Sequence, residues 1–208
     1  MSGAPDRPAP AFLPLIVENL PLDDLAPYRQ FVTWNPEWRA GTNGKPGRWA
    51  KPPRDPHTGD YADTGNPGIP ETWGAWDDVF PRYDRVGFAP TRNDPFTFLD
   101  VDNSVTPAGA IKPWAQAIVD RFPNAYWEYS PSGTGLKGFV RGHVPKNTVV
   151  PIGDGKLEVF SCGKFSTLTG HRLKGSSRTI GDGQAALAAL MTELFGGTQE
   201  VDGGQERP

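Results

Sequence analysis

The sequence contains a single cysteine, Cys162, among its 208 residues. One thiol excludes an internal disulfide and any zinc site built from several cysteines. No apolar run approaches the roughly 18 residues that a membrane-spanning helix needs, and the N-terminus lacks the basic and then apolar pattern of a secretion signal. We therefore expect a soluble, cytoplasmic protein with no membrane partner.

The chain is long enough for one domain with a substantial core, but not for two full-sized ones. Its 25 glycines and 23 prolines indicate many turns and loops, whereas 7 tryptophans and 11 phenylalanines argue against disorder. The polar, Gly/Pro-rich ends predict a disordered lead over residues 1–11 and a flexible tail or linker over 197–208. A single folded domain is expected over 12–196.

The net charge of −3 conceals a pattern along the chain. Residues 29–54 carry a net +5, residues 55–136 a net −7, and residues 137–178 a net +6. Two basic blocks flanking an acidic middle suit a polyanion bound around a carboxylate–metal centre. Solvated loops with scattered Lys and Arg side chains would produce the same pattern.

The spacing of apolar residues predicts an α+β fold with a mainly antiparallel sheet, because hairpins alternate with helices that would lie on one face. A long loop is expected over residues 35–70. Single strands are predicted at 31–34, 86–89 and 97–101, and helices at 71–83, 110–122 and 184–195. Two hairpins are predicted, one from strands 125–130 and 137–141, the other from strands 156–160 and 165–169.

The first segment that could carry catalytic or binding chemistry is Thr97–Asn103, which contains two aspartates, Asp100 and Asp102. Side chains alternate along a strand, so both carboxylates point to one face while Leu99 points into the core. Two such carboxylates repel unless a cation lies between them, and oxygen ligands suit Mg²⁺ or Mn²⁺. A pair of strand-end aspartates bound to turn amides is the alternative.

The second segment is the turn at residues 130–137 (SPSGTGLK). Small residues and glycines can present backbone N–H groups to phosphate oxygens, with hydroxyl and ammonium donors beside them. The spacing is not that of a P-loop, because Leu136 stands where a glycine should precede the lysine. An ordinary glycine-rich hairpin turn is the alternative. The candidate nucleotide-binding residues here are Ser130, Ser132, Gly133, Thr134, Gly135 and Lys137.

The third segment begins with Glu158, an acid within an otherwise apolar predicted strand. Hydroxyl and cationic residues follow it and could neutralise a triphosphate. A solvent-facing strand position is the alternative for Glu158, and a turn position the alternative for His171. The candidate nucleotide-binding residues of this segment are Lys164, Thr167, Thr169, His171 and Arg172.

Taken in order, a carboxylate pair, a glycine turn with a basic residue, and a lone carboxylate before Thr-Gly-His resemble the three motifs of the archaeo-eukaryotic primase superfamily. The sequence is most similar to the primase–polymerase (prim-pol) domains at the N-termini of phage and plasmid replication proteins. The upstream sequences FVTW (31–34), GRWAKPP (47–53), HTG (57–59), TW (72–73) and VGF (86–88) also resemble that family. The resemblance covers about residues 28–175.

This resemblance implies a small N-terminal α/β unit joined to an RRM-like unit, with the active site in the cleft between them. It implies a nucleotidyltransferase, a DNA primase/polymerase in which Asp100, Asp102 and Glu158 are catalytic and hold two Mg²⁺ or Mn²⁺ ions. The implied partners are a single-stranded DNA template and nucleoside triphosphates. Relatives usually continue into a helicase domain, so a helicase domain or protein is a further implied partner. The polar, Gly-rich end fits both an N-terminal piece of such a protein and an independent short protein.

Two positions depart from the family pattern. Lys137 stands where many members have His, which makes the expected triphosphate contact ionic and independent of pH near neutrality. Lys164 stands where relatives often have Arg, and a lysine lacks the bidentate phosphate geometry of a guanidinium.

The predicted loop at 35–70 combines basic residues with tryptophans, a composition that can bind a single strand by charge and stacking. A solvated insertion whose tryptophans pack on the domain is the alternative. Two other functions also fit the sequence, a metal-dependent nuclease with the same carboxylates and a non-catalytic single-stranded nucleic-acid-binding module. The candidate nucleic-acid-binding residues are Arg39, Lys45, Arg48, Trp49, Lys51 and Arg54.

Overall fold

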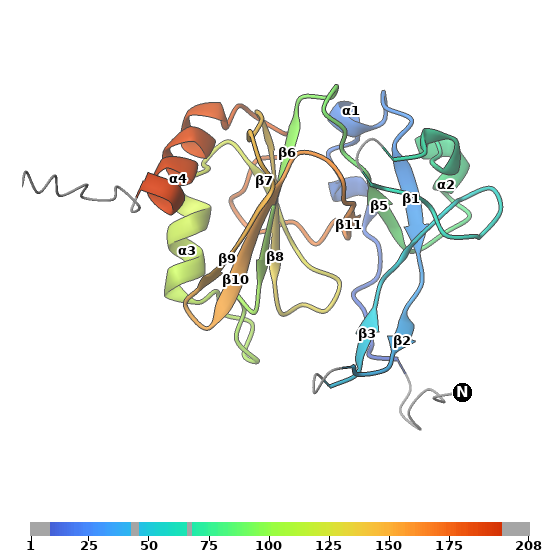
Figure 1. Ribbon diagram of the computed structural model, residues 1–208, viewed down its shortest axis with the longest axis horizontal. Helices are drawn as coiled ribbons and strands as arrows, with labels where there is room; N and C mark the ends of the chain where they lie inside the picture. The colour runs from blue at the N-terminus through green and yellow to red at the C-terminus, as the bar shows by residue number, and fades with distance from the viewer. Residues whose placement is uncertain (1–8, 43–45, 66–67, 197–208) are drawn as a thin grey trace, which may run out of the picture.

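The computed structural model describes residues 9–42, 46–65 and 68–196. Two antiparallel sheets face each other, and a short hairpin extends beyond them (Figure 1). The fold is therefore α+β with antiparallel sheets, as predicted. Most of the predicted lead and all of the predicted tail lie outside the described residues. In the described part of the chain, no helix has the length and apolarity needed to cross a membrane.

The larger sheet has five strands in the order β7-β8-β6-β10-β9, and all neighbours are antiparallel. Helices α3 and α4 cover its outer face (Figure 1). The chain runs β6-α3-β7-β8 and places β8 beside β6, which is the split arrangement expected of an RRM-like unit. These elements are β6 (Phe96–Asp102), α3 (Pro113–Asp120), β7 (Tyr126–Tyr129), β8 (Leu136–Arg141), β9 (Thr148–Ile152), β10 (Gly155–Phe160) and α4 (Gln184–Gly196).

The smaller sheet has four strands in the order β11-β5-β1-β4. Three of its strands come from the first part of the chain, but β11 arrives directly from β10 of the larger sheet. Helix α2 packs against β1, and α1 lies near the top of both sheets in Figure 1. These elements are η1 (Val17–Asn19), α1 (Leu22–Leu25), β1 (Phe31–Trp34), β4 (Pro53–Arg54), η2 (Pro70–Thr72), α2 (Trp76–Val79), β5 (Val86–Phe88) and β11 (Ser166–Leu168).

The predicted hairpin between strands 156–160 and 165–169 is wrong, because the two strands belong to different sheets. β10 pairs with β6 and β9, whereas Thr167 of β11 lies opposite Gly87 of β5. The true hairpin partner of β10 is β9, which is joined to it by the two residues Gly153 and Asp154. Gly153 has a positive φ of 57°, a conformation that suits such a tight turn.

The predicted loop at 35–70 contains regular structure that its Gly/Pro content concealed. β2 (Glu37–Arg39) and β3 (Arg48–Ala50) form an antiparallel hairpin, in which Trp38 lies opposite Trp49 with the rings 5.7 Å apart. A cross-strand aromatic pair of this kind stabilises a hairpin, whereas the surrounding glycine- and proline-rich residues would not stabilise one. The hairpin extends away from the two sheets in Figure 1.

The predicted helix at 71–83 is also wrong, since the segment holds only η2 and the four-residue α2. Pro81 disfavours helical backbone at the residue before it, so α2 ends at Val79. Trp73 is buried in a core position, and its indole N–H donates to the Asp63 carbonyl oxygen at 3.0 Å. The apolar spacing therefore reflects core contacts rather than one helical face.

The inner face of the larger sheet changes from aromatic to charged along four of its strands. On β6, Phe96 and Phe98 are followed on the same face by Asp100 and Asp102, as strand alternation requires. The aromatic half packs against the smaller sheet, and each fully buried Phe side chain contributes roughly 2–3 kcal/mol. The charged half is left facing the space between the sheets. The corresponding changes on the other strands are Phe139 to Lys137, Phe160 to Glu158 and Tyr126 to Glu128.

Candidate active site

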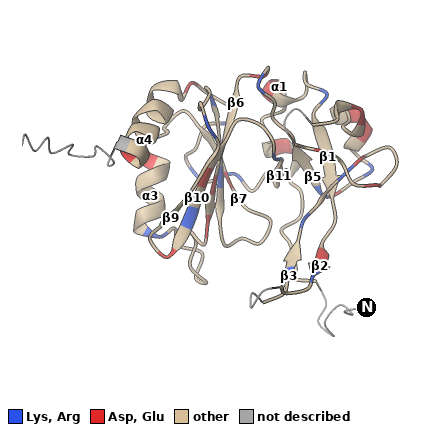
Figure 2. Cartoon of the chain, viewed as in Figure 1, with Lys and Arg blue, Asp and Glu red and all other residues tan. Residues whose placement is uncertain are grey.

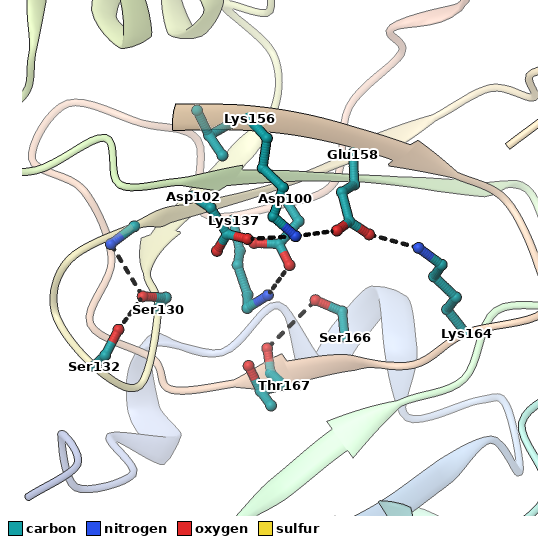
Figure 3. Close-up of polar contacts among 12 residues, drawn as sticks. Asp100, Asp102, Ser130, Ser132, Lys137, Lys156, Glu158, Lys164, Ser166 and Thr167 are labelled. Carbon is teal, nitrogen blue, oxygen red and sulfur yellow. Dashed lines mark hydrogen bonds and ion pairs between the residues drawn. The ribbon is translucent and has the colours of Figure 1, made fainter. Parts of the chain in front are cut away.

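Three carboxylates lie together on the charged half of the larger sheet. Glu158 of β10 is directly opposite Asp100 of β6, and Asp102 follows on the same face of β6. Figure 3 shows the three side chains pointing into the space between the sheets. The structure therefore brings together the residues that the first and third sequence segments contributed.

Each carboxylate is neutralised by lysine. Lys137 Nζ lies 2.9 Å from Asp100 Oδ2, and Lys164 Nζ lies 2.5 Å from Glu158 Oε2 (Figure 3). Lys156 joins the other two acids, since it contacts Glu158 and lies 2.9 Å from Asp102 Oδ2. Figure 2 shows basic and acidic positions close together on β10, which carries Lys156 and Glu158.

The lysine contacts also govern the ionisation of Glu158. Burial alone would raise the pKa of Glu158, but the hydrogen bonds from Lys156 and Lys164 hold that pKa below its usual value. Burial alone would lower the pKa of Lys156, but its bonds to Glu158 and Asp102 raise that pKa above the usual 10.5. Both groups are therefore charged at neutral pH.

Lys156 is a site residue that the sequence analysis missed. It lies two residues before Glu158 on the same strand, so strand alternation places both side chains on one face. The Lys-x-Glu spacing in a predicted strand was the available signal. It becomes informative only when β10 is known to pair with the strand that carries Asp100 and Asp102.

A pocket of about 550 Å³ lies between the two sheets beside these charges. It contains two buried oxygens that have no hydrogen-bond partner among the described residues, Asp100 Oδ1 and Thr167 Oγ1. Burying an unpaired polar atom is costly, so both atoms are suited to a ligand that supplies the missing partner. The lining includes Arg48, Lys51, Asp100, Lys137, Lys164 and Thr167.

Lys51 reaches this pocket from the segment between β3 and β4. Burial and the nearby charge of Lys137 lower the pKa of Lys51 from its usual 10.5, although Asp100 and Asp102 act in the opposite direction. The sequence placed Lys51 with the nucleic-acid-binding residues, and the structure places it in the pocket that also contains Asp100.

The glycine turn between β7 and β8 lies next to the acidic face. A Cβ on Gly135 would lie 2.9 Å from the Val101 carbonyl oxygen, so only glycine allows this approach. The hydroxyls of Ser130, Ser132 and Thr134 form a chain, with 3.2 Å and 2.8 Å between successive oxygens. Two amides of the turn are used within it. Gly133 N–H donates to the Ser130 carbonyl oxygen and Gly135 N–H donates to Ser130 Oγ.

The last three nucleotide-binding candidates are held by local contacts. Thr169 is buried and donates its hydroxyl to the Tyr129 carbonyl oxygen at 2.8 Å. His171 Nε2 lies 2.8 Å from the Pro14 carbonyl oxygen, and Arg172 donates to the Ser176 carbonyl oxygen. Their part in nucleotide binding stays a prediction.

The nucleic-acid-binding candidates divide into two groups. Arg39, Arg48 and Trp49 line the side of the pocket formed by the β2–β3 hairpin. Arg54 instead pairs with Glu37 at 3.0 Å and stacks on the Tyr61 ring. Lys45 lies outside the described residues.

The carboxylates have the chemistry of a divalent-cation site, because all their donor atoms are oxygens on neighbouring strands. The buried, unpartnered Asp100 Oδ1 fits such an ion. In the conformation described, lysines contact Asp100 Oδ2, Asp102 Oδ2 and both oxygens of Glu158. Consistent with this, no group of three or more His, Cys, Asp or Glu side chains is gathered as a metal site within residues 9–42, 46–65 and 68–196.

These features define an α+β protein whose acidic and basic residues meet between two antiparallel sheets. A curated protein described as a DNA primase-polymerase, from Nitratiruptor phage NrS-1, is 31% identical to it over 170 residues. The aligned region covers 77% of this chain but only 22% of the phage protein, so the chain spans about a fifth of the length of that relative. The chain belongs to the primase–polymerase family, as its motifs predicted. No protein-family model matches it.

Proposed function

We propose that this chain performs the nucleotidyl transfer of a DNA primase/polymerase. It extends a strand on a single-stranded DNA template with nucleotides taken from nucleoside triphosphates. The observation that carries the proposal is the pocket, where the carboxylate of Asp100 meets Arg48, Lys51, Lys137 and Lys164. A nucleoside triphosphate needs such a combination, since cations bind its phosphates and carboxylates hold its metal ions.

Asp100, Asp102 and Glu158 would hold the divalent ions, Mg²⁺ or Mn²⁺, two in number as in the motif resemblance. Such ions stabilise the charge on the reacting phosphoryl group and promote ionisation of the attacking 3′-hydroxyl. Binding them would require Lys156 to release Asp102 and Glu158, because its ammonium group pairs with both acids. The side chain is 44% exposed and therefore has room to turn toward solvent.

The protein's own groups position the nucleotide. Lys137 of the larger sheet is held by Asp100, and Lys51 reaches the same pocket from the segment between β3 and β4. Together they place positive charge on two sides of the triphosphate, which fixes its orientation toward the acidic face. The unpaired hydroxyl of Thr167 supplies a further donor from β11.

The β2–β3 hairpin is the proposed template contact. Arg39 and Arg48 lie opposite each other across the hairpin and line the mouth of the pocket, next to Trp49. This arrangement provides charge for the backbone of a single strand and an aromatic ring for a base. A strand held there would lead into the pocket.

The chain corresponds to about a fifth of the length of the phage relative. We therefore propose that it acts with a further domain or protein in phage- or plasmid-type replication, and the motif resemblance points to a helicase.

The test is synthesis on single-stranded DNA, with and without a primer, in the presence of Mg²⁺ or Mn²⁺. The variant Asp100→Ala/Asp102→Ala should abolish product lengthening. Asp154→Ala is the matched control, because Asp154 is an exposed carboxylate in the turn between β9 and β10 that pairs with Lys112 outside the pocket. It should retain full activity.

Other outcomes discriminate the alternative functions. Triphosphate-independent shortening of the DNA would indicate a nuclease. Single-strand binding without synthesis under either metal would overturn the proposal for this chain alone and leave a binding module.

A further inference from the structure

Glu128 is a carboxylate with no exposed surface, and the proposed chemistry does not use it. It lies on β7 directly opposite Lys137, which lies opposite Asp100, which lies opposite Glu158. The four side chains form one row across four neighbouring strands, on the face that borders the pocket. Glu128 is therefore the buried end of this row of acidic and basic side chains.

The carboxylate of Glu128 accepts three hydrogen bonds. The donors are the Tyr126 hydroxyl at 2.9 Å and the backbone N–H groups of Thr169 at 3.0 Å and Gly170 at 2.9 Å. Thr169 and Gly170 directly follow β11, which belongs to the smaller sheet. One side chain of the larger sheet thus fixes the end of a strand in the other sheet.

The turn held by Glu128 has little freedom to move. Gly170 has a positive φ of 68°, and a Cβ at this position would lie 1.9 Å from the Ile16 carbonyl oxygen. On the same side, Ile16 N–H donates to the Thr169 carbonyl oxygen at 2.8 Å. The turn is therefore clamped between Glu128 and the N-terminal segment, so the chain leaves the end of β11 at a fixed point.

The strand held in this way carries Thr167, two residues before Thr169. Its hydroxyl is one of the two buried, unpartnered oxygens of the pocket. Burying a carboxylate is costly unless donors satisfy it, and here both oxygens are satisfied by groups that converge from two sheets. A glutamine could not reproduce this, because its amide nitrogen would face a backbone N–H.

We propose that Glu128 is a positioning residue for the nucleotide pocket. It fixes the Thr169–Gly170 turn and thereby holds Thr167 and the β11 wall at the distance from Lys137 and Asp100 that a triphosphate requires. This inference rests on the proposed function.

The experiment compares wild type with Glu128→Gln and with a matched control, Asp24→Asn. Asp24 is also a tether, since it accepts the Ile180 N–H at 2.8 Å and pairs with Arg141, but it lies away from the pocket. Three quantities are measured: amide hydrogen exchange at Thr169 and Gly170, affinity for a nucleoside triphosphate with a non-cleavable α–β bridge, and affinity for single-stranded DNA.

Glu128→Gln should accelerate exchange at both amides and weaken nucleotide binding about tenfold, the scale for losing a hydrogen bond to a charged group. Single-strand affinity should stay within twofold of wild type. Asp24→Asn should lower stability without changing nucleotide affinity. Should Glu128→Gln fail to fold, Tyr126→Phe removes one of the three donors, and a weakening of about threefold is expected.

Unchanged exchange at the two amides, or wild-type nucleotide affinity in a folded variant, would overturn the inference. Equal weakening by Asp24→Asn would also overturn it, since the effect would then be one of global stability. Wild-type protein that binds no nucleotide would instead overturn the proposed function, and this inference with it.

Discussion

Lys137 Nζ lies 2.9 Å from Asp100 Oδ2, and the two residues stand directly opposite each other on β8 and β6. The lysine side chain is only 8% exposed and the aspartate side chain 23%. The pair therefore contributes to both the fold and the proposed site.

Replacing Lys137 with Met should destabilise the protein by about 3 kcal/mol, because a largely buried aspartate loses its counter-charge. The double variant Lys137→Met/Asp100→Asn should recover much of this loss, since no uncompensated charge remains. Urea unfolding of the two single variants and the double variant measures the coupling. Additive effects of the two substitutions would contradict this prediction.

Replacing Lys156 with Gln should tighten divalent-cation binding about fivefold, the equivalent of about 1 kcal/mol for a partly exposed ion pair. Lys156 joins Asp102 and Glu158, so its ammonium group competes with any cation for their oxygens. Mn²⁺ titration followed by electron paramagnetic resonance measures the affinity directly. Lys112→Gln, which removes the lysine paired with Asp154, is the control and should have no effect. Weaker Mn²⁺ binding in Lys156→Gln would refute the competition.

Replacing both Arg39 and Arg48 with Ala should weaken single-stranded DNA binding and reduce its salt dependence. Each phosphate contact contributes about 0.7 to the slope of log affinity against log salt for single strands, so two lost contacts predict a decrease of about 1.4. The control is Arg92→Ala/Arg178→Ala, which removes two exposed arginines outside the pocket. An unchanged slope in the hairpin variant would place the DNA elsewhere.

Glu128 should make stability depend on pH. Burial raises the pKa of Glu128 from its usual 4.5 to about 7, against the opposing effect of its hydrogen bonds. Between these values the native state retains a proton that the unfolded state releases, so stability falls as the pH rises from 4.5 to 7 and is constant above. Glu128→Gln lacks this titration, so wild type should lose about 3 kcal/mol of unfolding free energy relative to the variant as the pH rises across this window. Urea melts at pH 5, 6, 7 and 8 measure it, and parallel curves would contradict the prediction.

The acidic face could be predicted from the sequence because it depends on a local rule. Side chains two residues apart on a strand share a face, so Asp100 and Asp102 were placed together without knowledge of the fold. The hairpin of β7 and β8 was equally local, since its strands are joined by a short glycine turn.

The rest depends on contacts between distant segments. Residues 161–164 are typical of a turn, but whether the chain turns back or crosses to another sheet is decided by partners such as β5, more than 70 residues earlier. For the same reason Lys156 and Glu128 were missed, because each gains its role only from a partner strand. The β2–β3 hairpin was concealed by glycine and proline and depends on the contact between Trp38 and Trp49.

The crossing of the chain into the smaller sheet has a consequence for synthesis on the ribosome. β5 (Val86–Phe88) emerges long before its neighbour in the smaller sheet, because β11 begins only at Ser166. All five strands of the larger sheet have emerged by Phe160 and can pair first. Until β11 arrives, β5 has an unpaired edge of the kind that promotes association between nascent chains. Pairing with β11 therefore both completes the smaller sheet and covers the exposed edge of β5.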